Sequence, residues 1–129
     1  MKSEPQFMLL DDDPINNMFN KMIIKKIYPD ASLIAFEEPL KALEYLEHSF
    51  DRSSVEKTTL LLDINMPVMS GWEFMEEFEN LETAIKERIV IYILSSSIDP
   101  RDIEKAKDNT HVINFIEKPL SADFLKSLV

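Results

Sequence analysis

The chain has 129 residues, of which 45% are hydrophobic, so it is long enough for one domain with a buried core and short for two. Its 14 basic and 24 acidic residues give a net charge of −10, which would repel nucleic-acid phosphates and anionic membrane surfaces. The absence of cysteine excludes disulfides, thiolate zinc sites and cysteine nucleophiles. The single glycine excludes the glycine-rich phosphate loops of nucleotide-binding proteins, which need several glycines in fixed positions.

No leader or membrane segment is evident in the sequence. The first six residues are largely polar, and no apolar run approaches the ~18 residues of a membrane-spanning helix. Without cysteine or a signal peptide, a cytoplasmic protein is expected. Internal repeats, low-complexity tracts and linkers rich in proline or glycine are absent too. We therefore expect one domain over residues 1–129, with its core at about 7–128 and no output domain in this chain.

The first strand and helix are predicted by a short apolar run that ends abruptly in aspartates and a proline. Residues 7–10 (FMLL) precede residues 11–14 (DDDP), and an aspartate before a proline is typical of a helix start. We expect the helix to continue to a stop at residues 28–30. Its apolar residues recur at helical spacing, and the two methionines among them are expected in the core: Ile15, Met18, Phe19, Met22, Ile23 and Ile27.

The rest of the chain repeats this alternation. A strand at 32–36 and a helix at 39–47 come next, and the inward residues of that helix are expected to be Leu40, Leu43 and Leu46. A polar loop at 49–58 leads to strands at 60–63, 88–94 and 112–116, each followed by a helix, at 72–81, 99–108 and 121–128. Continuous apolar strands separated by amphipathic helices predict a parallel sheet covered on both faces. The fold class is therefore α/β, a doubly wound sandwich of five β/α units.

Polar side chains follow the predicted strands where each strand ends. Asp11 and Asp12 follow the first strand, and Asp63, Ser95 and Lys118 stand at the ends of the third, fourth and fifth strands, respectively. Taken singly, such residues are most often helix caps, turn formers or solvated charges. Ligands of open parallel sheets bind beyond the carboxyl ends of the strands, so these side chains are expected to gather in one crevice.

This crevice has the chemistry of a phosphate site. Neighbouring carboxylates repel one another, and one of them is driven toward protonation unless a cation compensates. Mg²⁺ or Mn²⁺ is the natural compensating ion, since Mg²⁺ is typically held by one or two carboxylates together with waters and a phosphoryl oxygen. Lys118 would add a second positive charge. Metal and lysine would then replace the backbone amides that bind phosphate in glycine-rich loops.

Four segments together resemble the motif set of response-regulator receiver domains, the CheY-like phosphoacceptor modules of two-component signalling. These segments are residues 7–14 (FMLLDDDP), 61–71 (LLDINMPVMSG), 94–96 (LSS) and 117–119 (EKP). The resemblance runs from about residue 7 to residue 125, in the order and spacing of the family. It implies a five-stranded, flavodoxin-like (βα)5 fold.

The resemblance also implies a role for each residue of the crevice. Asp63 would be the phosphoacceptor that attacks a phosphohistidine and forms an acyl phosphate. Asp12 would bind Mg²⁺ directly, and Asp11 would act mainly through a metal-bound water. Asp63 itself and the backbone carbonyl of Asn65 would complete the coordination by the protein. Lys118 would pair with Asp63 and then with a phosphoryl oxygen.

A conformational switch is implied by the same resemblance. Ser95 occupies the place of the family's switch hydroxyl and Phe115 that of its switch aromatic residue. The bond before Pro119 is cis in the family. We hypothesise that the surface that reports the change comprises the helix at 99–108, the strand at 112–116 and the last helix. The residues singled out on it are Arg101, Lys105, His111 and Phe115.

The implied partners are proteins. A sensor histidine kinase or a histidine phosphotransfer protein would supply the phosphoryl group, and Ile15, Asn16 and Phe19 are the docking candidates beside the acidic residues. A downstream protein would read the switch surface, without nucleic acid or membrane. The sequence leaves open whether phosphorylation produces a homodimer. Such a domain catalyses only its own phosphorylation and dephosphorylation and is not otherwise an enzyme.

Two other function classes use related residues. Hydrolases of the haloacid dehalogenase type also form an aspartyl phosphate with Mg²⁺, but they need a second aspartate two residues after the nucleophile, where Asn65 stands. A pseudo-receiver would act only by binding, but pseudo-receivers lack the acceptor, the acidic pair or the lysine, and all of these are present. The receiver interpretation is therefore preferred over both.

Three residues depart from the family pattern or serve its turns. Ser70 stands where an aspartate is usual before the glycine, and either residue suits a turn. Gly71 is expected to supply flexible backbone after the acceptor. Asn109 lies at the corner before the last strand, where it would take the left-handed conformation that ends many helices.

Overall fold

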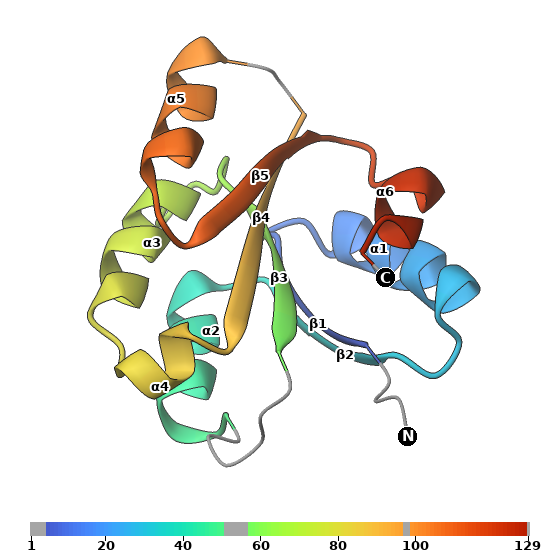
Figure 1. Cartoon of the computed structure of the whole chain (residues 1–129), viewed down its shortest axis with the longest axis horizontal. Helices are drawn as coiled ribbons and strands as arrows, with labels where there is room; N and C mark the ends of the chain where they lie inside the picture. The colour runs from blue at the N-terminus through green and yellow to red at the C-terminus, as the bar shows by residue number, and fades with distance from the viewer. Residues whose placement is uncertain (1–4, 51–56, 97–98, 129) are drawn as a thin grey trace.

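A computed structural model describes residues 5–50, 57–96 and 99–128 of the chain. Most of the predicted loop at 49–58 therefore lies outside the described residues. Within them, a single sheet contains five strands: β1 (Gln6–Leu10), β2 (Ser32–Phe36), β3 (Thr58–Asp63), β4 (Ile89–Ser95) and β5 (Val112–Glu117). The strand order is β2-β1-β3-β4-β5, and all neighbouring strands are parallel (Figure 1). The predicted doubly wound parallel sheet is confirmed.

The helices lie on both faces of this sheet. They are α1 (Pro14–Ile27), α2 (Pro39–His48), α3 (Gly71–Glu79), α4 (Thr83–Lys86), α5 (Pro100–Asp108) and α6 (Ala122–Lys126). Helices α1 and α6 pack side by side on one face, and α2, α3 and α5 cover the other (Figure 1). The short helix α4 was not predicted, because a single turn has too few residues for a periodic pattern; its Ile85 is fully buried.

Capping side chains start α1, α5 and α6 at the predicted places, whereas α2 has no side-chain cap. The side chains of Asp13, Asp99 and Ser121 accept hydrogen bonds from backbone N–H groups in the first turns of α1, α5 and α6. At α3 the cap is reciprocal: Ser70 Oγ accepts from Glu73 N at 3.1 Å, and Ser70 N donates to Glu73 Oε1 at 3.0 Å. Ser70 is therefore a helix cap rather than only a turn residue.

Two hydrophobic clusters hold the layers together, and alternate residues of strands β1 to β4 belong to different clusters. On β1, Met8 and Leu10 point toward the face covered by α2 and α3, whereas Phe7 and Leu9 point toward α1 and α6. The inner strands β1 and β3 are buried on both sides, which explains their uninterrupted apolar sequence. Both apolar segments therefore end at the same edge of the sheet, and polar residues follow them there.

The apolar stripe of α1 is only partly buried: four of its six predicted residues face solvent, contrary to the prediction, whereas Ile23 and Ile27 are partly buried and pack against the core. Its exposed residues are Ile15 (70%), Met18 (58%), Phe19 (45%) and Met22 (67%). The inward positions are instead Asn17, Asn20 and Ile24, all buried. The assignment of Met18 and Met22 to the core is therefore wrong. The physical reason is that Asn17 reaches main-chain carbonyls at the end of the sheet, which fixes the rotation of the helix about its axis.

A smaller error of the same kind affects α2. Leu40, expected to face inward, is 62% exposed, while Ala42 and Leu46 are fully buried. Leu43 is partly buried and packs against the core, as expected. The helix thus faces the sheet through Ala42 and Leu46, and Leu40 at its first turn lies beyond the core.

The exposed face of α1 leads to a prediction about stability. Met22→Gln is expected to change the free energy of unfolding by less than about 0.5 kcal/mol, because the side chain is already in water. Ile24→Ala, two residues further along the same helix, is expected to cost about 2–5 kcal/mol, because it removes a fully buried side chain. Urea denaturation of both variants measures the difference. A loss in Met22→Gln equal to that in Ile24→Ala would contradict this orientation of the helix.

Asn109 ends α5 with φ −95° and ψ 117°, which is extended backbone, and the left-handed conformation expected for it is wrong. Its N–H instead donates to Ala106 O, and its side chain accepts from His111 N.

None of the helices in the described ranges is long and apolar enough to span a membrane.

Candidate functional site

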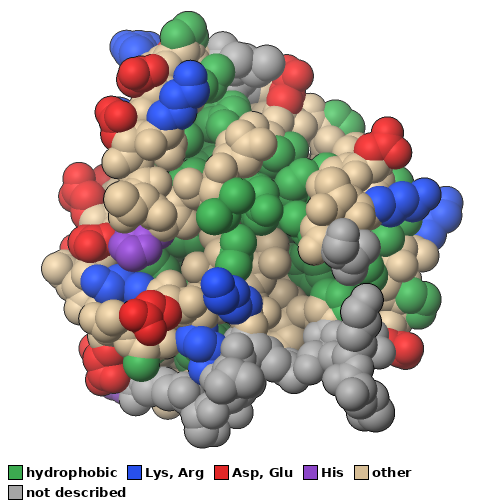
Figure 2. Space-filling view, in the orientation of Figure 1, with side chains coloured by type: hydrophobic (Ala, Val, Ile, Leu, Met, Phe, Trp, Pro, Cys, Tyr) green, Lys and Arg blue, Asp and Glu red, His purple; other side chains and the backbone are tan. Residues whose placement is uncertain are grey.

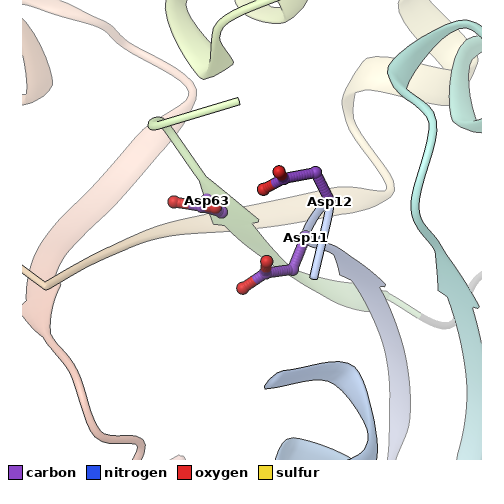
Figure 3. A group of neighbouring side chains, drawn as sticks. All are labelled: Asp11, Asp12 and Asp63. Carbon is purple, nitrogen blue, oxygen red and sulfur yellow. The ribbon is translucent and has the colours of Figure 1, made fainter. Parts of the chain in front are cut away.

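The ends of the strands bring the predicted polar residues together at one edge of the sheet. Leu10 is in register with Leu62 and Asp63 with Leu94, so Asp11, which follows β1, lies beside Asp63 at the end of β3. Figure 3 shows Asp11, Asp12 and Asp63 at this edge, with their carboxylates directed to the same side of the strand ends. One oxygen from each of the three lies within 4.8 Å of the others.

The three carboxylates differ in their surroundings. Asp11 and Asp63 are only 3% and 4% exposed, whereas Asp12 is exposed. Both oxygens of Asp11 accept hydrogen bonds, Oδ1 from Asp13 N at 2.9 Å and Oδ2 from Lys118 Nζ at 2.8 Å. Asp11 is therefore held firmly, while Asp12 presents its oxygens to solvent.

Lys118 lies between the two buried carboxylates. Its ammonium is 2.8 Å from Asp11 Oδ2 and 3.7 Å from Asp63 Oδ1. The expected pair of Lys118 with Asp63 is present, and the contact with Asp11 is shorter. Both carboxylates have lost most of their water, and one ammonium placed between them compensates both charges.

Burial has a large effect on the proton affinity of Asp63. It raises the pKa of this carboxyl from 3.8 to about 6, and the nearby charges of Asp11 and Asp12 add to the rise. The hydrogen bond that Asp63 Oδ1 accepts from Asn65 N, at 3.0 Å, and the charge of Lys118 oppose it. Repulsion between neighbouring carboxylates was expected to raise this pKa, but the loss of water contributes more.

A pH dependence of stability follows from this raised pKa. In Mg²⁺-free buffer, the contribution of Asp63 is fully present below pH 3.8 and is lost as the pH rises through about 6, because the folded protein must then hold a buried charge. A rise from 3.8 to about 6 corresponds to about 3 kcal/mol at most. Asp63→Asn should therefore be more stable than the wild type at pH 7.5 and nearly equal to it at pH 4. Urea denaturation in EDTA at both pH values tests this, and an equal difference at both would contradict it.

Ser95 and Asn65 connect neighbouring strand ends. Asn65 Nδ2 donates to Ser95 Oγ at 3.2 Å, and Lys118 N donates to Ser95 O at 2.8 Å. Ser95 is fully buried at the end of β4. The peptide bond between Lys118 and Pro119 is cis. The loops after β3, β4 and β5 thus meet at Ser95.

Phe115 lies on β5, one strand away from Ser95. It pairs with Ile93 in the β4–β5 register, and Ser95 pairs with Glu117. Its ring is partly buried and packs against the core cluster on the side of α2 and α3. The two residues predicted to form a switch are therefore on adjacent strands, two register positions apart.

The three docking candidates lie on the first turns of α1. Ile15 and Phe19 are exposed, and Asn16 is partly buried. Met18 and Met22 extend this apolar surface along the helix. These methionines were not predicted to lie at the surface, because helical spacing groups apolar side chains without indicating which way they face.

The surface predicted to report the switch makes contacts with α3. Trp72 Nε1 donates to Asp102 Oδ1 at 2.9 Å, and Lys105 Nζ lies 5.7 Å from the centre of the same indole ring. His111 Nε2 is 2.7 Å from Glu79 Oε2. Arg101, in contrast, is exposed and pairs with Asp99 in its own turn of helix. Figure 2 shows hydrophobic side chains over β5 and charged ones along the edge where α3 and α5 lie.

A protein-family model for the response regulator receiver domain matches residues 7–129. The chain belongs to this family. Two solved receiver structures agree with it over nearly their whole length. A two-component response regulator from Cytophaga hutchinsonii has a TM-score of 0.87 and 30% identity, covering 98% of this chain and 95% of that one. A response regulator receiver protein from Dyadobacter fermentans has a TM-score of 0.86 and 29% identity, covering 95% and 93%.

Curated relatives of the receiver domain are longer proteins. The cyclic di-GMP phosphodiesterase response regulator RpfG of Xanthomonas campestris is 28% identical over 113 residues, which are 88% of this chain and 28% of the relative. The two-component response regulator ORR1 of Oryza sativa (japonica) is 25% identical over 123 residues, which are 94% and 52%. The chain thus spans about a quarter to a half of these relatives, and the shared part is a receiver domain of two-component systems.

Proposed function

We propose that this receiver domain accepts a phosphoryl group from a phosphohistidine onto Asp63, with Mg²⁺ bound beside it. The observation that supports this most directly is the meeting of three carboxylates and one ammonium at the strand ends. One oxygen from each of Asp11, Asp12 and Asp63 lies within 4.8 Å of the others, and Lys118 is 2.8 Å from Asp11 and 3.7 Å from Asp63. A phosphoryl group carries charge on several oxygens, and an excess of carboxylate alone would repel it.

The donor atoms of this site suit Mg²⁺ or Mn²⁺. Both are hard ions that prefer oxygen, and Mg²⁺ usually keeps several waters besides one or two carboxylates. Asp12 would bind directly because it is exposed. Asp11 would act through water, since both of its oxygens already accept hydrogen bonds. Asp63 and the backbone carbonyl of Asn65 would complete the protein's ligands. The bound ion would supply counter-charge for the phosphoryl oxygens.

Asp63 would act as the nucleophile. One of its carboxylate oxygens forms a bond to phosphorus while the bond from phosphorus to the imidazole nitrogen of the donor breaks, and the product is an acyl phosphate. This step needs the ionised carboxylate, which the N–H of Asn65 and the ammonium of Lys118 favour over the protonated form. Lys118 can then hold one of the phosphoryl oxygens. Positioning and counter-charge are the main contributions to such a transfer.

The switch would act through residues that already touch the site. Ser95 would donate to the new phosphoryl oxygens, exchanging its contact with Asn65 for them. Phe115 would then turn toward the space that Ser95 leaves, and α5, β5 and α6 would present a changed surface to a downstream protein. Phosphate adds charge and three acceptor oxygens, so it shifts the balance between two packed states rather than creating a new fold.

The phosphodonor protein would dock on α1. Ile15, Asn16 and Phe19 flank the acidic residues, and Met18 and Met22 continue the exposed apolar surface. A sensor histidine kinase or a histidine phosphotransfer protein would bind there with its histidine directed at Asp63. In this function the domain catalyses only its own phosphorylation and dephosphorylation. Asn65 argues against a hydrolase of the haloacid dehalogenase type, because that position would need an acid.

Beryllofluoride, a stable mimic of the phosphoryl group, provides the test. Together with Mg²⁺ it is expected to change the emission of Trp72 in a saturable way, because this single tryptophan joins α3 to α5 through Asp102. Asp63→Asn is the control and should give no response. A wild type that does not respond, or that responds no more than this variant, would contradict the proposal. Sustained turnover of a phosphoester would favour the hydrolase.

A further inference from the structure

We propose that Asn17 is a positioning residue of this site: its side-chain amide fixes the main chain between Asp11 and Asp12 and so sets the geometry in which they hold Mg²⁺. This inference rests on the proposed function, because it assigns a further residue to the same site. Asn17 does not touch the metal or the phosphoryl group. It acts through the backbone of the residues that do.

The contacts of Asn17 converge on the ends of two strands. The residue lies on the inward face of α1 and is 5% exposed. Its Nδ2 donates to Asp11 O at 3.0 Å and to Phe36 O at 3.2 Å. Phe36 O also accepts from Asp11 N at 3.1 Å. One side-chain amide therefore ties α1 to the ends of both β1 and β2.

The amide of Asn17 can face only one way. Both groups next to its nitrogen are carbonyl oxygens, which accept and cannot donate, so the NH₂ group must point toward them. Its other atom, Oδ1, is buried and has no hydrogen-bond partner within the described residues. A buried acceptor without a partner is unfavourable. The two hydrogen bonds donated by the Asn17 amide therefore come with an unfavourable buried acceptor, Oδ1.

Capping of the helix does not account for this residue. The side chain of Asp13 already accepts from Ile15 N and caps α1. Asn17 is one turn further along, and its donors go to the sheet rather than to its own helix. Its contacts therefore stabilise the turn from β1 into α1, which is the segment that contains the acidic pair.

The direction of Asp12 depends on this turn. The carboxylate of Asp11 is held separately, by Asp13 N and Lys118. The side chain of Asp12 has no hydrogen bond or ion pair among the residues that the structure describes, so its direction is set by its main chain and its rotamer rather than by a polar partner. The carbonyl that Asn17 binds belongs to the peptide unit between Asp11 and Asp12. Fixing this unit fixes where the Asp12 side chain begins.

Loss of a hydrogen-bonding group that orients metal ligands typically weakens metal binding by 10–100-fold. We therefore expect Asn17→Ala to raise the Mg²⁺ dissociation constant at least tenfold, measured by isothermal titration calorimetry on the whole chain. Ile24→Ala is the matched control. It removes a buried side chain from the same face of α1 but touches no residue of the site. It should lower the melting temperature of the Mg²⁺-free protein while leaving the dissociation constant within about twofold.

The outcomes separate this inference from the proposed function. If the wild type binds Mg²⁺ and Asn17→Ala binds it within twofold as tightly, or if Ile24→Ala weakens binding as much, the positioning role is overturned and the proposed function stands. If the wild type itself gives no binding, both are overturned. Should Asn17→Ala fail to fold, Asn17→Ser, which keeps one donor, decides: a severalfold weaker affinity supports the role, and an unchanged one overturns it.

Discussion

Asp63→Asn is expected to abolish phosphorylation by a small acyl- or amidophosphate donor in the presence of Mg²⁺. The amide nitrogen and oxygen of asparagine are poor nucleophiles, and the substitution also removes one of the three negative charges that gather at the strand ends. Intact-mass measurement should detect a phosphoryl adduct on the wild type and none on the variant. The effect is a complete loss, the largest among our predictions.

A control variant makes this result specific. Asp30→Asn also removes an aspartate, but from an exposed position between α1 and β2. It should be labelled at the wild-type rate. Normal labelling of Asp63→Asn would overturn the assignment of the acceptor, and loss of labelling in Asp30→Asn would mean that total charge, rather than one residue, governs the reaction.

Gly71→Ala is expected to lower the free energy of unfolding by about 2 kcal/mol. A Cβ at this position would lie 2.6 Å from Ile64 Cα, 2.7 Å from Ile64 Cγ2 and 2.9 Å from Asp63 O. Two of these are main-chain atoms of the segment that leads away from the acceptor, so they cannot move aside freely. Overpacking of this kind costs about 1–3 kcal/mol, and the better helix propensity of alanine offsets at most about 1 kcal/mol.

The same substitution should also slow phosphorylation, because Asp63 O must shift to admit the methyl group. Urea denaturation and the rate of labelling measure the two effects. Glu76→Ala, at an exposed position on the same helix, should change stability by less than about 0.5 kcal/mol. A Gly71→Ala protein as stable as Glu76→Ala would contradict the close packing found here.

The role of Gly71 illustrates what the sequence could not provide. We expect flexible backbone there from the motif, but its φ is not in the left-handed region, and it is the first residue of α3. Only the packing of α3 against Ile64 reveals that the position lacks space for a side chain. Such a contact depends on how two elements meet, and neither hydrophobic period nor motif spacing contains that information.

The strands and the site were predictable for a common physical reason. Buried parallel strands are uninterrupted apolar runs, so their ends are visible in the sequence, and polar residues at those ends must share one edge of the sheet. This reasoning placed Asp11, Asp63 and Lys118 together. It could not say that Lys118 would lie closer to Asp11 than to Asp63, because that depends on side-chain geometry about 1 Å in scale.

Helix α1 shows the limit of periodicity. Its apolar and polar residues both recur at helical spacing, and burial of the apolar set is the usual outcome. Here Asn17 is buried because main-chain carbonyls at the strand ends require donors, and four of the six apolar residues turn outward as a result. Ile23 and Ile27 still pack against the core. The asparagine is visible in the sequence, but the two carbonyls that accept from it come together only when the strands pair.

The exposed apolar residues of α1 make the net negative charge of the chain relevant to its association in solution. An exposed apolar patch favours association between copies, whereas a net charge of −10 makes two approaching copies repel each other. This repulsion is screened beyond about 10 Å at 0.1 M salt, and it disappears near the isoelectric point, pI ≈ 4.6. The colloidal stability of the protein is therefore expected to decrease as salt is added or as the pH falls toward that value.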